Sequence, residues 1–491
     1  MLAHLPILQV VVPLLAAPTC LIFERSRAAW LLACLASFVS LAISIALLQQ
    51  VADGSVISYA LGGWEAPWGI EYRIDALTAY VLLVISAIGA LVILGSRPSL
   101  DAELVPGRQT PFVVLMLLCM SGLLGIVATG DIFNVFVFLE ISSLATYSMV
   151  SLGKSRGALL ASYRYLIVGT VGATFFLFGI GILYALTGTL NMLDLAERLP
   201  NVGAPWATTA AYGFIMLGIA MKLAMFPLHG WLPEAYNRAP SIATALLAAT
   251  STKVALYLFI RMHYTVFTPE LADAYMPLSK VLLVLGAAGV LVGSASAIAE
   301  NAIKRLLALS SVAQIGYMVI GVGLGTAMGL QASLLHLFNH ALMKAALFMA
   351  IAAVVLRVGG SQLSDFKGLG RAMPWTMAAF VIGSLSLIGV PLTVGFVSKW
   401  YLILALFESS QWAVLAVVAV GSVLGLFYVW KIIESAYFQQ RDNAATVKEA
   451  PLALLIPMWA LVLANLYFGI DTSMTVDVSQ TIARVLTGGA Q

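Results

Sequence analysis

The feature that most constrains this sequence is a long series of apolar runs, each about 20 residues long, separated by charged or Gly/Pro-rich segments. An α-helix of that length crosses the hydrocarbon core of a bilayer. The runs lack the two-residue alternation of apolar and polar side chains that indicates a half-buried strand. Because lipid cannot satisfy backbone hydrogen bonds, only helices and closed barrels span a membrane. The sequence therefore predicts an all-α polytopic membrane protein.

The composition indicates that lipid is the main solvent of this chain. Hydrophobic residues make up 61% of the 491 residues and charged residues only 10%, whereas soluble domains average about 25% charged residues. The net charge of +3 comes without a polybasic tract, so we expect no nucleic-acid partner. Cys20, Cys34 and Cys119 lie in or beside apolar runs without CxxC spacing. We therefore expect these cysteines to be packing residues, and we expect this protein to bind no metal and no other cofactor.

Fourteen candidate spans make residues 1–491 a single transmembrane domain. The spans cover residues 5–23, 28–49, 74–95, 112–129, 132–152, 162–187, 208–228, 241–262, 276–298, 303–325, 330–356, 375–407, 411–438 and 451–470. Residues 1–100 hold the first three helices, and residues 451–491 hold the last helix and a tail.

The loop charges predict the orientation of these spans. Sixteen of the 25 Lys and Arg residues lie in loops after odd-numbered spans, and five lie on the opposite side. Positively charged loops stay in the cytoplasm, so we expect both termini on the outer side. The opening MLAHLPILQV has no cationic region, and we expect no cleaved signal peptide.

Four lysines remain inside the apolar spans, together with one carboxylate. They are Lys222, Lys253, Lys344 and Lys399, in spans 7, 8, 11 and 12, and Glu140 in span 5. A charge at the bilayer centre costs about 2.5–3.5 kcal/mol on insertion scales, so these groups should face the bundle interior. Snorkelling or a structural ion pair are the alternatives, and snorkelling stays open for the two lysines near a span end. For the set as a whole, we favour a functional pathway.

Two spans are interrupted at corresponding places. Span 7 continues into Pro227 and Gly230 shortly after Lys222, and span 12 contains Gly389, Pro391 and Gly395 before Lys399. A proline inside a span removes a backbone hydrogen bond. The interrupted spans are five apart, which predicts two five-helix repeats, helices 4–8 (residues 112–262) and 9–13 (residues 276–438). An odd number of helices inverts the second repeat, and inverted repeats with discontinuous helices are typical of ion translocators.

Three polar residues in span 11 lie on a single helix face. His336, His340 and Lys344 are four residues apart. Two histidines at this spacing suit zinc, but an adjacent lysine opposes a cation. A proton relay fits better, since imidazole exchanges protons near neutral pH. His229, in the break of span 7, either links the relay to the cytoplasmic side or caps the interface.

Several motifs resemble the antiporter-like subunits of complex I and its relatives. They are GDIFNVFVFLEISSLATYSM around Glu140, MKLAMFPLHGWLPEAYNRAPSIATALLAATSTKVALY around Lys222 and Lys253, KRLLALSSVAQIGYM, HLFNHALMKAALF and PLTVGFVSKW. Within that superfamily the chain is most similar to the D subunits of Mrp-type multisubunit Na⁺/H⁺ antiporters, to which LGGWEAPWGIEYRIDALTAY (61–80) points. Complex I has three such antiporter-like subunits, which differ in length. The middle-sized one usually has glutamate where Lys399 stands here, and the longest one carries a lateral helix that this sequence does not show. The smallest one is therefore the second-best match, after the Mrp D subunits.

The resemblance implies a proton-translocating subunit of the bacterial inner membrane, surrounded by other membrane subunits. It implies that Glu140, Lys222, Lys253, Lys344 and Lys399 form a chain of protonatable groups at mid-depth. We expect Glu140 to pair with Lys222, which passes its proton to Lys253 and on, past the two histidines of span 11, to Lys399. We expect access through the two broken helices.

Three interpretations of different class remain open. The first is a subunit of a cation/proton antiporter, and the second is a proton-pumping subunit of a complex I-like NADH:quinone oxidoreductase or membrane-bound hydrogenase. The chain has no GxGxxG dinucleotide fingerprint and no cysteines to hold a cluster, so redox chemistry would lie in its partners. The third is a solitary carrier or a passive scaffold. Amines are poor ligands for Na⁺ or K⁺, which favours protons as the ion moved along these residues.

Overall fold

Helices form nearly all of the described structure. The computed structural model describes residues 2–23, 25–268, 277–440 and 447–488. Within those ranges, 13 helices are long and apolar enough to cross a membrane. They are α1 (Leu5–Thr19), α2 (Ser26–Gln50), α3 (Ala76–Gly95), α5 (Gln109–Ala128), α6 (Ile132–Ser151), α7 (Gly157–Thr187), α9 (Pro205–Leu223), α11 (Ser241–Arg261), α13 (Leu278–Ala299), α14 (Ile303–Gly323), α15 (Ala327–Val358), α19 (Trp412–Phe438) and α20 (Leu452–Ile470).

The remaining predicted span, the twelfth, consists of two half-helices, α17 (Pro374–Ile388) and α18 (Val394–Glu408). All fourteen predicted spans are therefore present. The predicted start of the ninth span, residue 276, lies outside the described residues. The seventh span is also broken, because α9 is followed by a separate short helix, α10 (Trp231–Arg238).

Both breaks begin with the same type of helix end. Ala224 and Gly389 adopt left-handed conformations, with φ of 57° and 97°. In each case the next N–H reaches back to a carbonyl five residues earlier, Met225 to Ala220 and Val390 to Leu385. This Schellman-type arrangement pairs a carbonyl of the last turn and turns the chain out of the helix. A proline follows within three residues of each cap, and it cannot continue the helix.

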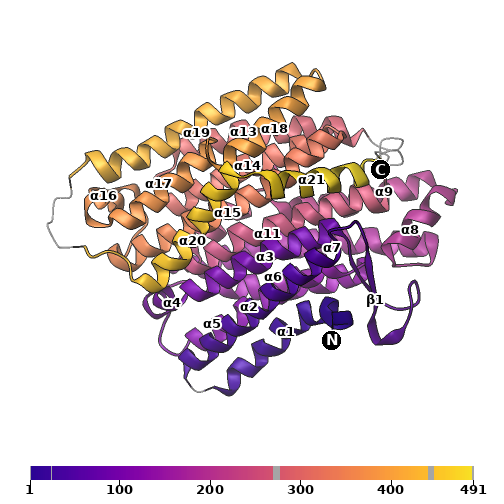
Figure 1. Ribbon diagram of the computed structural model, residues 1–491, viewed down its shortest axis with the longest axis horizontal. Coiled ribbons are helices and arrows are strands. Elements are labelled where there is room, and N and C mark those ends of the chain that lie inside the picture. The colour runs from indigo at the N-terminus through magenta and orange to yellow at the C-terminus, as the bar shows by residue number, and fades with distance from the viewer. Residues whose placement is uncertain (1, 24, 269–276, 441–446, 489–491) are drawn as a thin grey trace.

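The helices run roughly parallel between two ends of the bundle (Figure 1). The N- and C-termini lie at one end together with β1 (Ile57–Ala60) and α8 (Met192–Arg198), and we call this the terminal end. The short helices α4 (Arg97–Glu103) and α16 (Leu369–Ala372) lie at the opposite end. The even number of spans places both termini on one side of the bundle.

Repeated contacts mark the two inverted five-helix units. Ser162 donates to the carbonyl of Tyr147 at 2.7 Å, and Ser333, 171 positions later, donates to that of Met318 at 2.6 Å. A bridge between Asp131 and Asn191 beside α8 likewise recurs 171 positions later, between Ala302 and Gln362. The first bridge lies at the terminal end and the second at the opposite end, so the second unit is inverted.

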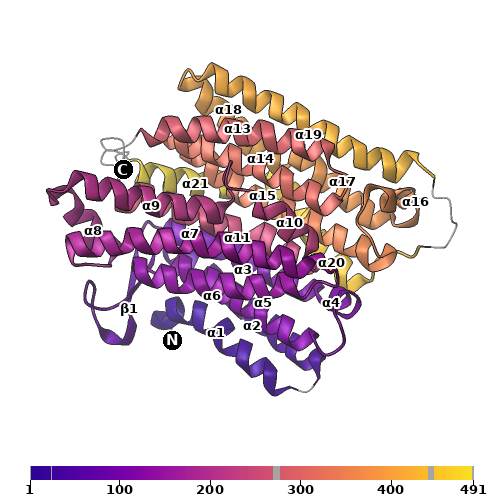
Figure 2. The ribbon, with the colours of Figure 1, turned by 180° about the vertical axis from the view of Figure 1, so that it is seen from behind.

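The spans differ in how many of their residues are buried. The share of buried residues is 94% in the most apolar stretches of α11 and α14 and 78% in those of α15, α3 and α5, against 28% in that of α19. Seen from behind, α7, α9 and α13 lie on the outside of the bundle (Figure 2). Two of the well-buried helices, α11 and α15, carry Lys253 and Lys344, so the fold places these lysines far from lipid.

The sequence prediction missed several short elements at the two ends. β1 pairs antiparallel with β2 (Glu71–Ile74), with Ile57 opposite Ile74, within the predicted three-helix segment 1–100. The expected C-terminal tail contains a further helix, α21 (Ser473–Leu486), which packs on α15. These elements are short or amphipathic, so they do not stand out in a search for apolar runs of membrane-spanning length.

Candidate functional site

Lys222 lies in the last turn of α9, next to the break. Its ammonium donates a hydrogen bond to the hydroxyl of Ser143 on α6. It also lies 5.5 Å from the ring centre of Tyr147 and 5.8 Å from that of Tyr165. Aromatic rings attract a cation within about 6 Å. The charge is therefore held without a carboxylate in direct contact.

Glu140 lies one turn before Ser143 on α6 but does not form the expected direct pair with Lys222. Among the described residues, no ion pair of 4.0 Å or less involves Glu140. The two charges still interact through space. Ser143, whose own hydroxyl donates to the carbonyl of Leu139, occupies the position next to the ammonium. In this conformation, Glu140 therefore acts on Lys222 from a distance.

The side chain of Glu140 belongs to a stripe of α6 that faces the outside of the bundle. Phe133, Val137 and Leu144 on the same stripe are 44%, 39% and 54% exposed, and Glu140 itself is half-buried. Residues three and four apart share one face of a helix. Glu140 thus lies between the bundle interior and its lateral surface.

A cavity of about 20 Å³ adjoins Lys222 on the side of α11. Ser142, Thr146, Tyr165 and Ser251 are polar residues of its otherwise mostly apolar lining. A space of this size holds about one water molecule, and a water needs two or more polar partners. The cavity therefore lies where a water would connect Lys222 toward α11.

Lys253 is fully buried in the middle of α11. Its ammonium donates to the carbonyl of Ala248 at 2.6 Å and to the hydroxyl of Thr252 at 3.3 Å. Within the described ranges no carboxylate lies within ion-pair distance of it. Its partners are neutral groups of its own helix.

The three residues predicted on one face of α15 do share that face. The rings of His336 and His340 stack with centroids 5.9 Å apart. Lys344 donates to the carbonyl of Leu307 and to the hydroxyl of Ser310 on α14, both at 2.7 Å. Both histidines and this lysine are buried.

His336 links α15 to both neighbouring elements. Its Nδ1 lies 2.8 Å from the hydroxyl of Ser398 on α18, and its Nε2 lies 2.9 Å from the side-chain carbonyl of Gln314 on α14. His340 has no hydrogen-bond partner among the described residues. Lys253 and Lys344 both act electrostatically on His340. The histidines therefore lie between the lysines of the two repeats.

Lys399 lies on α18 and reaches back across the break. Its ammonium donates to the carbonyls of Leu387 and Ile388, at 3.1 and 2.7 Å, and lies 4.8 Å from the ring centre of Tyr317. The C-terminal end of a helix favours a cation because its last carbonyls are unpaired. Lys222 thus belongs to the last turn of the first half-helix α9, and the ammonium of Lys399 lies at the C-terminal end of the first half-helix α17.

His229 lies apart from the other predicted residues. It is half-buried in the break between α9 and α10, where its ring stacks on Phe226 with centroids 5.5 Å apart. Its Nδ1 has no hydrogen-bond partner in the part of the chain that the structure describes. No hydrogen bond there joins it to one of the four lysines.

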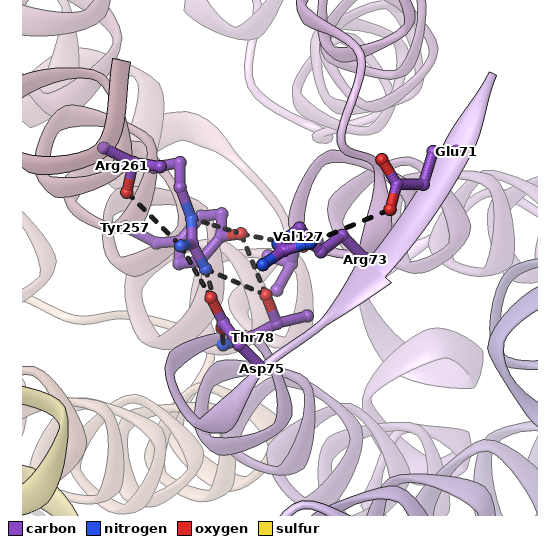
Figure 3. Close-up of polar contacts among 8 residues, drawn as sticks. Glu71, Arg73, Asp75, Thr78, Val127, Tyr257 and Arg261 are labelled. Atoms are coloured by element: carbon purple, nitrogen blue, oxygen red, sulfur yellow. Dashed lines mark hydrogen bonds and ion pairs between the residues drawn. The ribbon is translucent and has the colours of Figure 1, made fainter. Parts of the chain in front are cut away.

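The loop-charge count missed a buried ion pair at the terminal end of α11 (Figure 3). The guanidinium of Arg261 binds both oxygens of Asp75, at 2.7 and 2.8 Å, and also donates to Thr78 at 3.0 Å. Burial alone raises the pKa of Asp75, but Arg261 and the Thr78 N–H lower it to about 2. The apolar helix continues past Arg261 to Val266, and this was the available signal that Arg261 is not a loop residue.

A second buried pair lies at the other end of α11. Lys304, also counted as a loop charge, is 4% exposed and donates to the carbonyl of Ala239 at 3.0 Å. Its Nζ lies 3.9 Å from Glu103, which accepts hydrogen bonds from the N–H and hydroxyl of Ser241 at 2.9 Å. Asp75 and Glu103 therefore hold the two ends of α11, and both come from the segment that contains α3 and α4.

The described residues contain no group of three or more His, Cys, Asp and Glu side chains arranged to hold a metal ion. Cys20, Cys34 and Cys119 are buried and unpaired with one another. The candidate site therefore consists of amines, imidazoles, hydroxyls and one carboxylate, groups that carry protons.

Comparisons with known proteins agree on one family. The family model described as "NADH:quinone oxidoreductase/Mrp antiporter, TM" matches residues 129–425. The chain is 42% identical to the N subunit of the NADH-quinone oxidoreductase of Desulforudis audaxviator, over 92% of this chain and 90% of the relative. It is 28% identical to the D subunit of the Na⁺/H⁺ antiporter of Alkalihalophilus pseudofirmus, over 98% of this chain and 96% of the relative.

The fold is similar to that of a chain in a solved multisubunit structure. The Mrp complex from Dietzia sp. contains a chain with a TM-score of 0.90 and 27% sequence identity. The similarity covers 99% of this chain and 97% of that one. The match extends over the whole transmembrane bundle, the breaks and the central helices included.

Proposed function

The chain belongs to the NADH:quinone oxidoreductase/Mrp antiporter transmembrane family, and from this premise we propose that it is the proton-translocating subunit of a multisubunit monovalent cation/proton antiporter. One observation carries the proposal. Lys253, Lys344 and Lys399 are buried inside membrane-spanning helices and Lys222 is partly buried there, and no carboxylate lies within ion-pair distance of any of these four lysines in the described residues. A lysine solvated only by neutral groups gives up its proton more readily than one paired with an anion.

The proposed relay runs through the centre of the bundle from Lys222 to Lys399. A proton leaves Lys222 through the adjoining cavity to Lys253, passes along His340 and Lys344, and reaches Lys399 by way of His336. Glu140 sets the charge state of Lys222 from its position one turn from Ser143. The groups interact strongly enough to titrate as a coupled set.

Glu140 also supports a multisubunit assembly. A carboxylate on a lipid-facing stripe is costly, so intramembrane charges face protein or water. In the assembled complex, a neighbouring membrane subunit covers the exposed stripe of α6 and places a cationic group near Glu140. We expect His229 to connect the relay to the cytoplasmic side through the break between α9 and α10.

The orientation follows from the loop charges. We propose that the end holding α4 and α16 is cytoplasmic and that both termini lie outside the bacterial inner membrane. Na⁺ or K⁺ would not follow the lysine relay, because hard cations require oxygen ligands. The cation path then lies elsewhere in the assembly.

The 42% identity to one component of an NADH-quinone oxidoreductase favours a second candidate function, that of a proton-pumping subunit in a redox complex. The relay would be the same, and its driving force would come from partner subunits. Identification of the co-purifying subunits by mass spectrometry separates the two. Flavin- or cluster-containing partners would establish the redox complex.

Proton transport in vesicles that contain the intact assembly tests the relay. We expect the variants Glu140→Ala, Lys222→Ala and Lys399→Ala to lose most cation-driven proton transport. The exposed Lys280 supplies a matched control, since Lys280→Ala also removes an amine but lies outside the relay. Transport near the wild-type rate in all three relay variants would contradict the proposal.

A further inference from the structure

The two ends of α11 differ in how open they are. At the opposite end, a polar cavity of about 470 Å³ lies beside Glu103 and Lys304 and extends to Lys154 and Arg238. At the terminal end, the cavity beside Arg261 measures only about 20 Å³. The cavity beside the terminal end of the helix that carries Lys253 is therefore much smaller than the cavity beside its other end.

A compact polar cluster fills the terminal end (Figure 3). Arg261 is held by both oxygens of Asp75 and by Thr78. Its Nε also donates to the hydroxyl of Tyr257 at 3.3 Å. That hydroxyl in turn donates to the carbonyl of Val127 on α5 at 2.8 Å. The cluster joins α3, α5 and α11 across the end of the bundle.

The cluster lies directly in line with Lys253. Lys253, Tyr257 and Arg261 are four residues apart, so they follow one another along a single face of α11. Two such steps correspond to about 12 Å along the helix axis. Tyr257 and Arg261 also line the small cavity, together with Arg73 and Thr129. A path that follows this face of α11 from Lys253 to the terminal end therefore passes this cluster.

We propose that Asp75, Tyr257 and Arg261 form the gate that closes the terminal end of the bundle to the proton relay at Lys253. This inference rests on the proposed function. Asp75 comes from the N-terminal helices, which lie outside the two repeats, whereas Arg261 and Tyr257 come from the first repeat. A movement of the repeat against α3 separates the guanidinium from the carboxylate and lets water reach Tyr257. The gate residues position and exclude water; they are not themselves steps of the relay.

Passive proton entry tests this gate separately from driven transport. The intact assembly is reconstituted in vesicles with a pH-sensitive dye inside, and a proton gradient is imposed without any cation gradient. Asp75→Asn keeps the size of the side chain and its cap on α3 but removes the anion. We expect this variant to leak protons severalfold faster than the wild type, and we expect Lys253→Ala in the same chain to return the leak to the wild-type level.

Two further variants make the result decisive. Asp101→Asn removes an exposed ion pair with Arg97 at the opposite end and should leave the leak unchanged. Tyr257→Phe removes only a hydroxyl and should produce a smaller leak, which tests the gate even if Asp75→Asn fails to assemble. Assembled gate variants without a leak, or a leak that persists in the Lys253→Ala background, would overturn the gate. In that case, loss of cation-driven transport in the single variant Lys253→Ala would still support the relay.

Discussion

Lys222 and Lys399 illustrate two ways to keep an ammonium inside a membrane bundle. Lys222 donates to one hydroxyl and lies over two tyrosine rings. Lys399 donates to two carbonyls that the break between α17 and α18 leaves free. Rings, carbonyls and hydroxyls stabilise the charge without fixing it, because none of them is an anion. We therefore propose that both residues alternate between charged and neutral forms during transport.

The ion pair at the terminal end should resist acid. The pKa of Asp75 is lower in the folded protein than in an unfolded chain, where its ordinary value is about 3.9. The charge on Asp75 therefore contributes its full stability above about pH 3.9, and this contribution is lost only as the pH falls toward about 2. We expect the passive proton permeability of the wild-type assembly to stay constant from about pH 8 to pH 5, well above both values. Dye-loaded vesicles measure it directly. A rise in permeability that titrates near pH 6 would show that another group controls the terminal end.

The sequence located the buried lysines because a charge within a long apolar run is easily recognised. It misplaced Arg261 and Lys304, which lie within a few residues of the ends of α11 and α14. Near a helix end, a snorkelling residue, a loop residue and a buried residue look alike in sequence. Contacts with Asp75 and Glu103, residues more than a hundred positions away, help to hold these two cations inside the protein.

At the scale of single elements, the sequence predicts where the two broken spans are interrupted, but it does not predict the short elements at the terminal end of the bundle. Pro227 and Pro391 each remove a backbone donor, and this effect is local to the sequence. The hairpin of β1 and β2 depends on pairing across a ten-residue connection, Leu61–Ile70, and α21 on a face provided by α15. The direct contact between Glu140 and Lys222 is absent for a different reason, since Ser143, three residues later on the same helix, takes the position nearer to the ammonium.

Gly389 should be essential to the second break. Its φ of 97° strains any residue with a Cβ, and an added Cβ would also meet the side chain of Lys399. We expect Gly389→Ala to cost about 1–2 kcal/mol of stability and to slow driven transport by displacing that ammonium. Thermal unfolding and vesicle transport measure the two effects. Gly181→Ala, at an open and exposed helical position, is the matched control; equal behaviour of the two variants would contradict a role for the break.

At the scale of the whole molecule, we propose that the two repeats carry the relay and that the N-terminal helices form its frame. The inverted units place one broken helix toward each side, as the repeated contacts 171 positions apart indicate. The segment of α3 and α4 lies outside both units and holds α11 at both ends through Asp75 and Glu103. We propose that the first repeat, which contains α11 and Lys253, moves against this segment when the contact between Arg261 and Asp75 opens.

The most direct test of the relay is cation-driven proton transport by the intact assembly with Lys344→Ala. This lysine is fully buried at the centre of the bundle, on the same face of α15 as the two histidines, and it donates to the hydroxyl of Ser310. We expect transport to fall to the level of vesicles without protein, while the Lys280→Ala variant transports at the wild-type rate. Wild-type transport by a correctly assembled Lys344→Ala variant would contradict the relay.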